Sequence, residues 1–298
     1  MSQPVEFFPS FASHWIDTDA GRIFARSAGS GPPLVLLHGF PQSMVMWRRV
    51  APLLAQHFHV VVMDLRGYGW SSAPDSDNGE LYTKRMMADD VVQAMEDLGH
   101  IRFRLAGHDR GARLGYRLAL DHPGRIEKLA LLDILPTVEV WKNIRSGKTP
   151  AAHWTFLSQP APTPEHEIAA QGPDAYFEGL MAKWSKSQTL QAFDRAALEA
   201  YRSAWGDTSR IHAFCEDYRA GAAQDLAADE ADVAAGRTLS CPAQILWGNF
   251  YLTASARTPL DVWRAGFAPQ ATGTAIDAGH FLAEENPQAT AEALLSFF

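Results

Sequence analysis

LAGHDRGARLGY, residues 105–116, is the stretch of sequence that decides the fold. Its centre, residues 107–111, has the pattern G-x-D-x-G. The related pattern G-x-S-x-G marks a sharp turn between a strand and a helix, and this turn presents its middle side chain to a pocket as a nucleophile. Because Asp109 takes the middle position here, the pattern predicts a carboxylate nucleophile.

Short apolar runs before and after this turn predict the strands of one sheet. They cover residues 33–37, 59–63, 103–106, 129–132 and 243–247. Uninterrupted apolar runs are typical of parallel strands that are buried on both faces. Helical patterns lie between them, for example over residues 82–98 and 110–121. The predicted fold class is therefore α/β, with a mostly parallel, doubly wound sheet.

The part of the chain between the last two apolar runs has a different character. From about residue 136 to residue 236 no strong strand run occurs, and helix-like stretches such as 188–205 dominate. We therefore assign residues 1–136 and 236–298 to the core and residues 137–235 to an inserted helical cap. This cap is expected to cover the carboxyl edge of the sheet, where ligands bind in open α/β sheets. The acidic, alanine-rich residues 225–235 predict a solvated helix surface.

The composition argues against several classes of partner. The chain has 298 residues, with 26 Lys and Arg against 34 Asp and Glu, a formal net charge of −8. No basic run occurs, so a nucleic-acid partner is not expected. The N-terminal residues lack the basic and apolar regions of a signal peptide, and no apolar run is long enough to cross a bilayer. We therefore expect a cytoplasmic protein without a membrane partner.

A nucleophile on such a turn needs a histidine base and an acid that orients it. His280 follows the last strand candidate, close to the C-terminus, and is the predicted base. Residues 249–253 after the 243–247 run contain no carboxylate. Asp133, at the end of the 129–132 run, is therefore the predicted acid. Its alternative role is to cap the following loop, and Asp277 is a weaker rival because it is too near His280 in sequence.

These residues predict a two-step reaction. Asp109 would displace a leaving group from a saturated carbon and form an alkyl ester. His280, held by Asp133, would then activate a water molecule that attacks the ester carbonyl. The backbone N–H groups of Arg110 and Phe40 are predicted to form the oxyanion hole. No metal or organic cofactor is expected, because Asp, His and water suffice.

Arg110 and Arg113 fall in the first turn of the helix that follows Asp109. The N-terminus of a helix is partly positive, so cations are unfavourable there. With a bound anion the same arrangement becomes a binding site. We therefore predict that both guanidinium groups bind a carboxylate of the substrate in a bidentate manner. The alternative is that they are surface arginines paired with the cap.

The chain resembles the α/β-hydrolase family over its whole length. Residues 64–71, DLRGYGWS, match the family loop D-x-R-G-x-G-x-S, which shapes a tight turn. More narrowly, the chain is similar to the fluoroacetate dehalogenases, also called haloacetate dehalogenases. The stretches that carry this resemblance are residues 107–113, 132–136, 153–154, 215–221 and 279–281.

The fluoroacetate dehalogenase resemblance implies a small anionic substrate, a haloacetate, and a homodimer. It also implies that His153, Trp154 and Tyr218 bind the leaving halide. Three N–H and O–H donors directed at one point would stabilise fluoride, a poor leaving group, as it departs. Residues 249–252, NFYL, depart from the loop expected in this family.

Other functions fit parts of the pattern. Epoxide hydrolases of this fold also use an Asp nucleophile, and Tyr218 with Tyr176 or Tyr201 could activate an epoxide. A neutral epoxide, however, does not explain Arg113. Haloalkane dehalogenases place Trp after the nucleophile, where this chain has Arg110. A non-catalytic binder of small ligands on the same fold is the remaining alternative.

Overall fold

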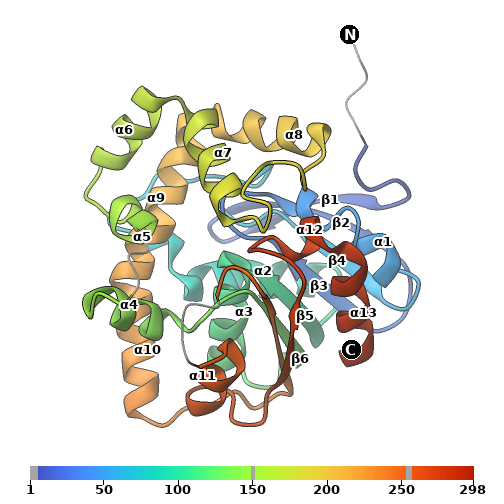
Figure 1. The fold of residues 1–298 in the computed structure, drawn as a ribbon. Helices are drawn as coiled ribbons and strands as arrows, with labels where there is room; N and C mark the ends of the chain where they lie inside the picture. The colour runs from blue at the N-terminus through green and yellow to red at the C-terminus, as the bar shows by residue number, and fades with distance from the viewer. Residues whose placement is uncertain (1–5, 149–151, 253–256) are drawn as a thin grey trace.

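The computed structural model describes residues 6–148, 152–252 and 257–298. In these residues one sheet has the strand order β1-β2-β4-β3-β5-β6-β7-β8 (Figure 1). Strands β1 and β2 pair in antiparallel fashion, as do β2 and β4, and all later pairs are parallel. The strands are β1 (Ala12–Thr18), β2 (Gly21–Ala28), β3 (Pro33–Leu37), β4 (His59–Met63), β5 (Phe103–His108), β6 (Ile126–Leu132), β7 (Ala243–Gly248) and β8 (Thr272–Ile276).

Both faces of the sheet are buried along its central strands β3 to β7, as the apolar runs predicted. In β3, Leu34 and Leu36 belong to one apolar cluster, which includes α1 and α13, whereas Val35 and Leu37 belong to the other, which includes α2 and α3. Alternate side chains of a strand point to opposite faces, so each face packs on its own helices. The helices outside the β6–β7 connection are η1 (Met44–Trp47), α1 (Ala51–Leu54), η2 (Glu80–Tyr82), α2 (Lys84–Asp97), α3 (Arg110–Asp121), α11 (Pro259–Ala265), α12 (Leu282–Glu285) and α13 (Pro287–Phe297).

The sequence missed three strands, β1, β2 and β8. In β1 the side chain of Ile16 is buried while that of Trp15 is exposed, and β8 is mostly exposed. These strands lie at or next to the ends of the sheet. A strand buried on one face only, such as β1, lacks an uninterrupted apolar run, and in β2 the apolar run is short, covering residues 23–25. The signal on which the prediction depended was therefore weak or absent.

The connection between β6 and β7 is helical wherever the structure describes regular structure in it. Its helices are α4 (Thr137–Arg145), α5 (Ala152–Leu157), α6 (Thr163–Gln171), α7 (Pro173–Trp184), α8 (Arg195–Trp205), α9 (Thr208–Ala222) and α10 (Gln224–Ala234). They gather on one side of the sheet, in green to orange in Figure 1. The predicted helix over residues 188–205 begins only at Arg195, because the residues before it form turns. The division at residues 137 and 235 stays a prediction.

The prediction of a solvated surface for residues 225–235 is wrong on one face of α10. Asp225, Asp229 and Asp232 of this helix are buried. Asp229 accepts a hydrogen bond from the Tyr116 hydroxyl at 2.8 Å, and Asp232 forms an ion pair with Arg117. Both partners lie on α3, more than a hundred residues earlier, so the local sequence could not reveal them. Among the described residues, no helix is long and apolar enough to span a bilayer.

Candidate active site

Asp109 lies between β5 and α3, where the G-x-D-x-G pattern predicted a sharp turn. Its backbone angles are φ +45° and ψ −111°. A positive φ is rare for a residue other than glycine and marks a strained turn that the surroundings must hold. The Asp109 N–H donates to the carbonyl oxygen of Leu132 at 3.2 Å, which ties the turn to the end of β6. The carboxylate is buried at the carboxyl edge of the sheet.

Two glycines allow the loop after β3 to lie against this turn. A Cβ atom on Gly111 would lie 2.5 Å from the carbonyl oxygen of His38, and one on Gly39 would lie 2.5 Å from the Cβ of Asp109. Neither distance is possible, so both positions require glycine. The close approach lets the Phe40 N–H donate to Asp109 Oδ1 at 3.0 Å. Phe40, the predicted oxyanion donor, therefore already faces the predicted nucleophile.

The structure brings Asp109, Asp133 and His280 together. His280 Nδ1 lies 2.6 Å from Asp133 Oδ2, and His280 Nε2 lies 3.9 Å from Asp109 Oδ2. Gly248 donates its N–H to the other Asp133 oxygen at 2.8 Å. Asp133 thus fixes the His280 tautomer with its proton on Nδ1 and leaves Nε2 facing the nucleophile. The rival acid Asp277 is exposed and bonds to Lys186 and Asn249 instead.

The charges in the site keep the two reactive groups in useful protonation states. Burial opposes ionisation of Asp109, but His280, Arg110 and Arg113 together hold the pKa of its carboxyl well below the usual range. Burial also opposes protonation of His280, yet the hydrogen bond and the charge of Asp133 raise the pKa of its imidazole above 6.5. Asp109 is therefore ionised at neutral pH, while Asp133 favours the protonated form of His280.

Arg110 has a partner that the sequence prediction did not include. Its buried guanidinium donates from Nε to Asp217 Oδ2 at 3.1 Å and from Nη2 to Asp217 Oδ1 at 2.5 Å. Asp217 lies on α9. The charge count behind the prediction was incomplete, because it balanced two arginines against Asp109 alone. Arg110 Nη1 is also buried and has no hydrogen-bond partner in the described part of the chain.

In the described part of the chain, Arg113 has only neutral hydrogen-bond partners. Its Nη1 donates to the carbonyl oxygen of Leu135 at 3.0 Å and to the hydroxyl of Thr137 at 3.1 Å. Its Nε is buried and, within the described ranges, has no acceptor. A buried donor without a partner costs about 1–3 kcal/mol. Arg110 and Arg113 therefore each present an unpaired N–H that a bound carboxylate could satisfy.

The three residues predicted to bind halide also come together. The ring centroids of Trp154 and Tyr218 are 5.6 Å apart, and those of His153 and Tyr218 are 5.9 Å apart. The Arg110 guanidinium lies 4.4 Å from the centre of the Tyr218 ring, and that of Arg113 lies 4.5 Å from the Trp154 ring. Burial lowers the pKa of His153 to about 3, so this imidazole is neutral near pH 7. The aromatic cluster is thus continuous with the arginines.

Sequence reasoning missed two aromatic neighbours of the base. The Trp184 ring at the end of α7 is 4.5 Å from the His153 ring and 5.6 Å from the His280 ring. The Tyr251 ring is 4.7 Å from the His280 ring. No motif contains Trp184. Tyr251 lies in the loop 249–252, which departs from the family pattern, and that departure was the signal that could have indicated it.

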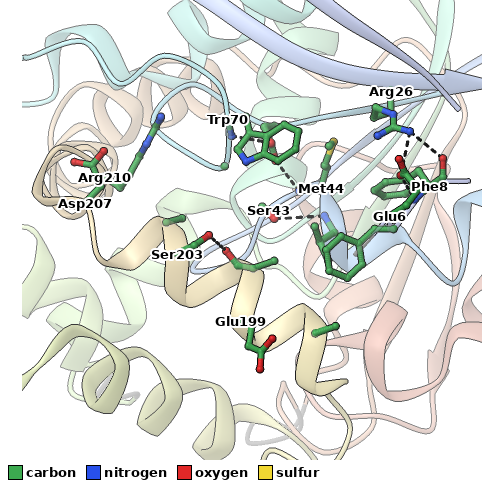
Figure 2. Close-up of a pocket in the computed structure, with 17 residues that line it drawn as sticks. Glu6, Phe8, Arg26, Ser43, Met44, Trp70, Glu199, Ser203, Asp207 and Arg210 are labelled. Carbon is green, nitrogen blue, oxygen red and sulfur yellow. Dashed lines mark hydrogen bonds and ion pairs between the residues drawn. The ribbon is translucent and has the colours of Figure 1, made fainter. Parts of the chain in front are cut away.

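A separate groove of about 530 Å³ lies between the N-terminal segment, η1, the 64–71 loop and α8 (Figure 2). Its wall includes Phe8, Met44, Trp70, Glu199 and Arg210. None of the predicted site residues lines this groove. In the described ranges, no group of three or more His, Cys, Asp or Glu side chains is arranged to hold a metal ion. The predicted chemistry therefore converges on Asp109 and not on this groove.

Comparisons with known proteins agree with the fold described above. A family model described as "alpha/beta hydrolase fold" matches residues 32–287. A fluoroacetate dehalogenase from Burkholderia sp is 43% identical over 295 residues, covering 97% of this chain and 94% of that protein. A soluble epoxide hydrolase from Corynebacterium sp. (strain C12) is 30% identical over 278 residues, covering 91% and 92%. A crystal structure described as an α/β hydrolase from Nostoc sp PCC 7120 matches with a TM-score of 0.92 and 44% identity, covering 98% and 99%.

Proposed function

Since the chain belongs to the α/β-hydrolase fold family, we propose that it is a hydrolase acting on carbon–halide bonds, which converts a haloacetate such as fluoroacetate to glycolate and halide. One observation carries this proposal. An ionised aspartate on the nucleophile turn lies 3.9 Å from His280 Nε2 and close enough to Arg110 and Arg113 for their charges to lower its pKa, and within the described ranges each of these buried arginines has an N–H without a partner. The 43% identity to a fluoroacetate dehalogenase supports the same substrate class.

In the first step Asp109 Oδ2 attacks the carbon that carries the halogen. The carbon–halogen bond breaks, and the halide leaves with its electron pair. Asp109 Oδ1 stays at the Phe40 N–H, 3.0 Å away, and becomes the carbonyl oxygen of the new ester. The proposal places the substrate carboxylate at Arg110 and Arg113, which aligns the carbon for displacement.

In the second step His280 Nε2 takes a proton from a water molecule, whose oxygen attacks the ester carbonyl of Asp109. The backbone N–H groups of Phe40 and Arg110 then donate hydrogen bonds to Oδ1 and stabilise the negative charge that develops there. Collapse of this intermediate breaks the bond between the Asp109 carboxyl carbon and the glycolate oxygen. That oxygen takes up the proton of the added hydroxyl, which leaves one water oxygen in the Asp109 carboxylate, and His280 then releases its proton to solvent. Asp133 stabilises the His280 imidazolium through the 2.6 Å contact at Nδ1.

The halide site of the proposal consists of His153, Trp154 and Tyr218. The indole N–H of Trp154 and the hydroxyl of Tyr218 have no hydrogen-bond partner among the residues that the structure describes. The neutral imidazole of His153 can donate one N–H to the same region. Free donors around a single point suit a small anion with concentrated charge, which is the character of a departing fluoride.

An epoxide hydrolase is the second candidate, because a soluble epoxide hydrolase is 30% identical and Tyr218 lies in the site. An epoxide hydrolase of this kind would use a second tyrosine beside Tyr218. The Tyr201 hydroxyl is not available for this role, because it donates to Glu284 at 2.6 Å and accepts from Gln42. The ring of Tyr176 packs against the rings of Phe156 and Phe177. A neutral epoxide would also leave the arginine N–H groups unpaired, so the haloacid is the better substrate class.

The test is the release of fluoride and chloride from fluoroacetate and chloroacetate, with styrene oxide hydrolysis assayed in parallel. We expect both halides. Diol from styrene oxide without halide from either acid would replace the proposal with the epoxide hydrolase. No turnover of any of the three would favour the non-catalytic binder. We also propose that the protein is a homodimer, lies in the cytoplasm and is divided into a core and a cap as predicted. Light scattering tests the homodimer.

A further inference from the structure

Asp217 binds two cations at once, and the mechanism above uses only one of them. Arg110 donates hydrogen bonds to both carboxylate oxygens of Asp217. Lys84, the first residue of α2, bonds through Nζ to Asp217 Oδ1, and the Tyr68 hydroxyl donates to Oδ2 at 2.9 Å. These four side chains are at most 2% exposed. Lys84 is therefore a buried cation in direct contact with the counterion of Arg110.

Among the residues that the structure describes, Lys84 Nζ has no second carboxylate in hydrogen-bond range. Its other neighbours are the carbonyl oxygen of Tyr82 at 3.5 Å and the Met87 sulfur at 3.6 Å. The nearby Asp225 accepts from the backbone N–H of Lys84 at 2.8 Å and not from Nζ. Burying an ammonium group is costly, so its presence here needs a counterpart in charge.

The charge count gives Lys84 a function. An isolated Arg110–Asp217 pair is neutral and would attract an anion weakly. Lys84 shares the Asp217 carboxylate with Arg110, so these three groups together carry one net positive charge. Burial raises the pKa of the neighbouring Asp225 carboxyl, which opposes the ionisation that would cancel this charge. In a buried site such a charge acts on a nearby anion far more strongly than in water. Arg110 Nη1, which has no hydrogen-bond partner among the described residues, is then the group that can donate to a bound anion.

We propose that Lys84 is a positioning residue that acts through Asp217 and sets the affinity of Arg110 for the carboxylate of the substrate. Lys84 itself touches no substrate. This inference rests on the proposed function only for the nature of the ligand, a small carboxylate. Without Lys84, the negative charge of Asp217 would fully neutralise Arg110, and the site would attract anions more weakly.

The test measures the binding of glycolate and of its neutral analogue glycolamide by ligand-observed NMR, which detects weak complexes. In Lys84→Met, whose side chain is similar in length but uncharged, the Kd of glycolate should rise roughly tenfold. The Kd of glycolamide should stay within about twofold of its wild-type value. Lys84→Arg is the matched control, because it keeps the charge and should keep the glycolate affinity.

A double variant separates charge from packing. In Lys84→Met/Asp217→Asn the net charge returns to that of the wild type, so glycolate affinity should recover relative to Lys84→Met. If Lys84 only fills space, the second substitution should add its own damage. Should Lys84→Met not fold, Lys84→Gln provides the same comparison with Asp217 in place: loss of the Lys84 charge must again weaken glycolate and spare glycolamide.

The inference is overturned if loss of Lys84 leaves glycolate binding unchanged, or if it weakens glycolate and glycolamide equally. It is also overturned if the wild-type chain does not bind glycolate. A chain that shows the Lys84 effect on glycolate but releases no halide from haloacetates would remove the proposed function and keep this inference. The two failures are therefore distinguishable.

Discussion

The two sides of the candidate site are built in different ways. At the sheet edge, Phe40, Asp109, Asp133 and His280 contact one another through short polar contacts and stand close to the ends of strands. Among the inserted helices, His153, Trp154, Trp184 and Tyr218 contact one another through their rings. Asp217 of α9 is the charged link between the two sides.

This difference suggests a division of labour. The sheet edge holds its atoms in fixed positions and would make and break bonds, whereas the helices would select the anion and the leaving group. Substitutions at the sheet edge should therefore affect every substrate alike. Substitutions among the helices and at the arginines should change the preference between substrates. The four predictions below test this division, from the largest expected effect to the smallest.

The largest effect is expected from His280→Asn. Without a base, the Asp109 ester should form but not hydrolyse, so chloroacetate should give a burst of about one chloride per site and then no further release. Steady-state turnover should fall by about 10²–10⁴-fold. Rapid-quench chloride measurement and mass spectrometry of the esterified Asp109 peptide check this. Asp109→Ala is the control and should show no burst, while steady turnover in His280→Asn would remove His280 from the mechanism.

The second effect concerns Arg113, whose hydrogen-bond partners in the described part of the chain are neutral oxygens. In Arg113→Met the KM for chloroacetate should rise by about 10–100-fold, the cost of one charge-assisted hydrogen bond, and the KM for chloroacetamide should change little. Arg195→Met is the matched control: it removes the same charge from a side chain that is 91% exposed. Equal damage to the acid and the amide would refute the carboxylate site.

How much of this could be read from the sequence differs between the two sides. Asp109 and His280 were predictable because a local motif and the chain order place them at strand ends. Asp133 followed from the absence of a carboxylate after β7. The interaction between Arg110 and Asp217 joins residues 107 positions apart, and no local pattern encodes it. The resemblance to a known family indicated His153, Trp154 and Tyr218; without it, Trp154 and Tyr218 would have been assigned to the core.

The same limit explains the errors in the fold. The buried strands β3 to β7 have apolar runs that local sequence reveals, whereas β1, β2 and β8 do not. The aspartates of α10 resemble a solvated face until Tyr116 and Arg117 of α3 are placed against them. In α10, partners from a distant segment decide which side chains are buried, and only the three-dimensional arrangement reveals them. The missed strands have a different cause, because they lack the uninterrupted apolar run on which the prediction depended.

A third prediction compares the two chemical steps by their pH dependence. Ester hydrolysis needs neutral His280, whose pKa is raised by Asp133, so its rate should fall about tenfold per pH unit once the pH drops below that pKa. Ester formation needs ionised Asp109, whose pKa is held well below its usual range. The burst rate should therefore stay constant over the same pH range. Single-turnover experiments between pH 5 and 9 measure both, and parallel declines would contradict the separate roles.

The smallest effect is expected from Trp154→Phe, which removes an indole N–H but keeps an aromatic ring. Fluoride depends more on its donors than chloride does, because its charge is more concentrated. The ratio of kcat/KM for fluoroacetate to that for chloroacetate should fall by about tenfold, or 1.4 kcal/mol. Trp141→Phe is the matched control: its ring lies 5.8 Å from that of Trp154, but its N–H already donates to the carbonyl oxygen of Gly221 at 2.8 Å. An unchanged ratio in Trp154→Phe would leave Trp154 as packing, and equal shifts in both variants would mean that the helices select the halide by shape.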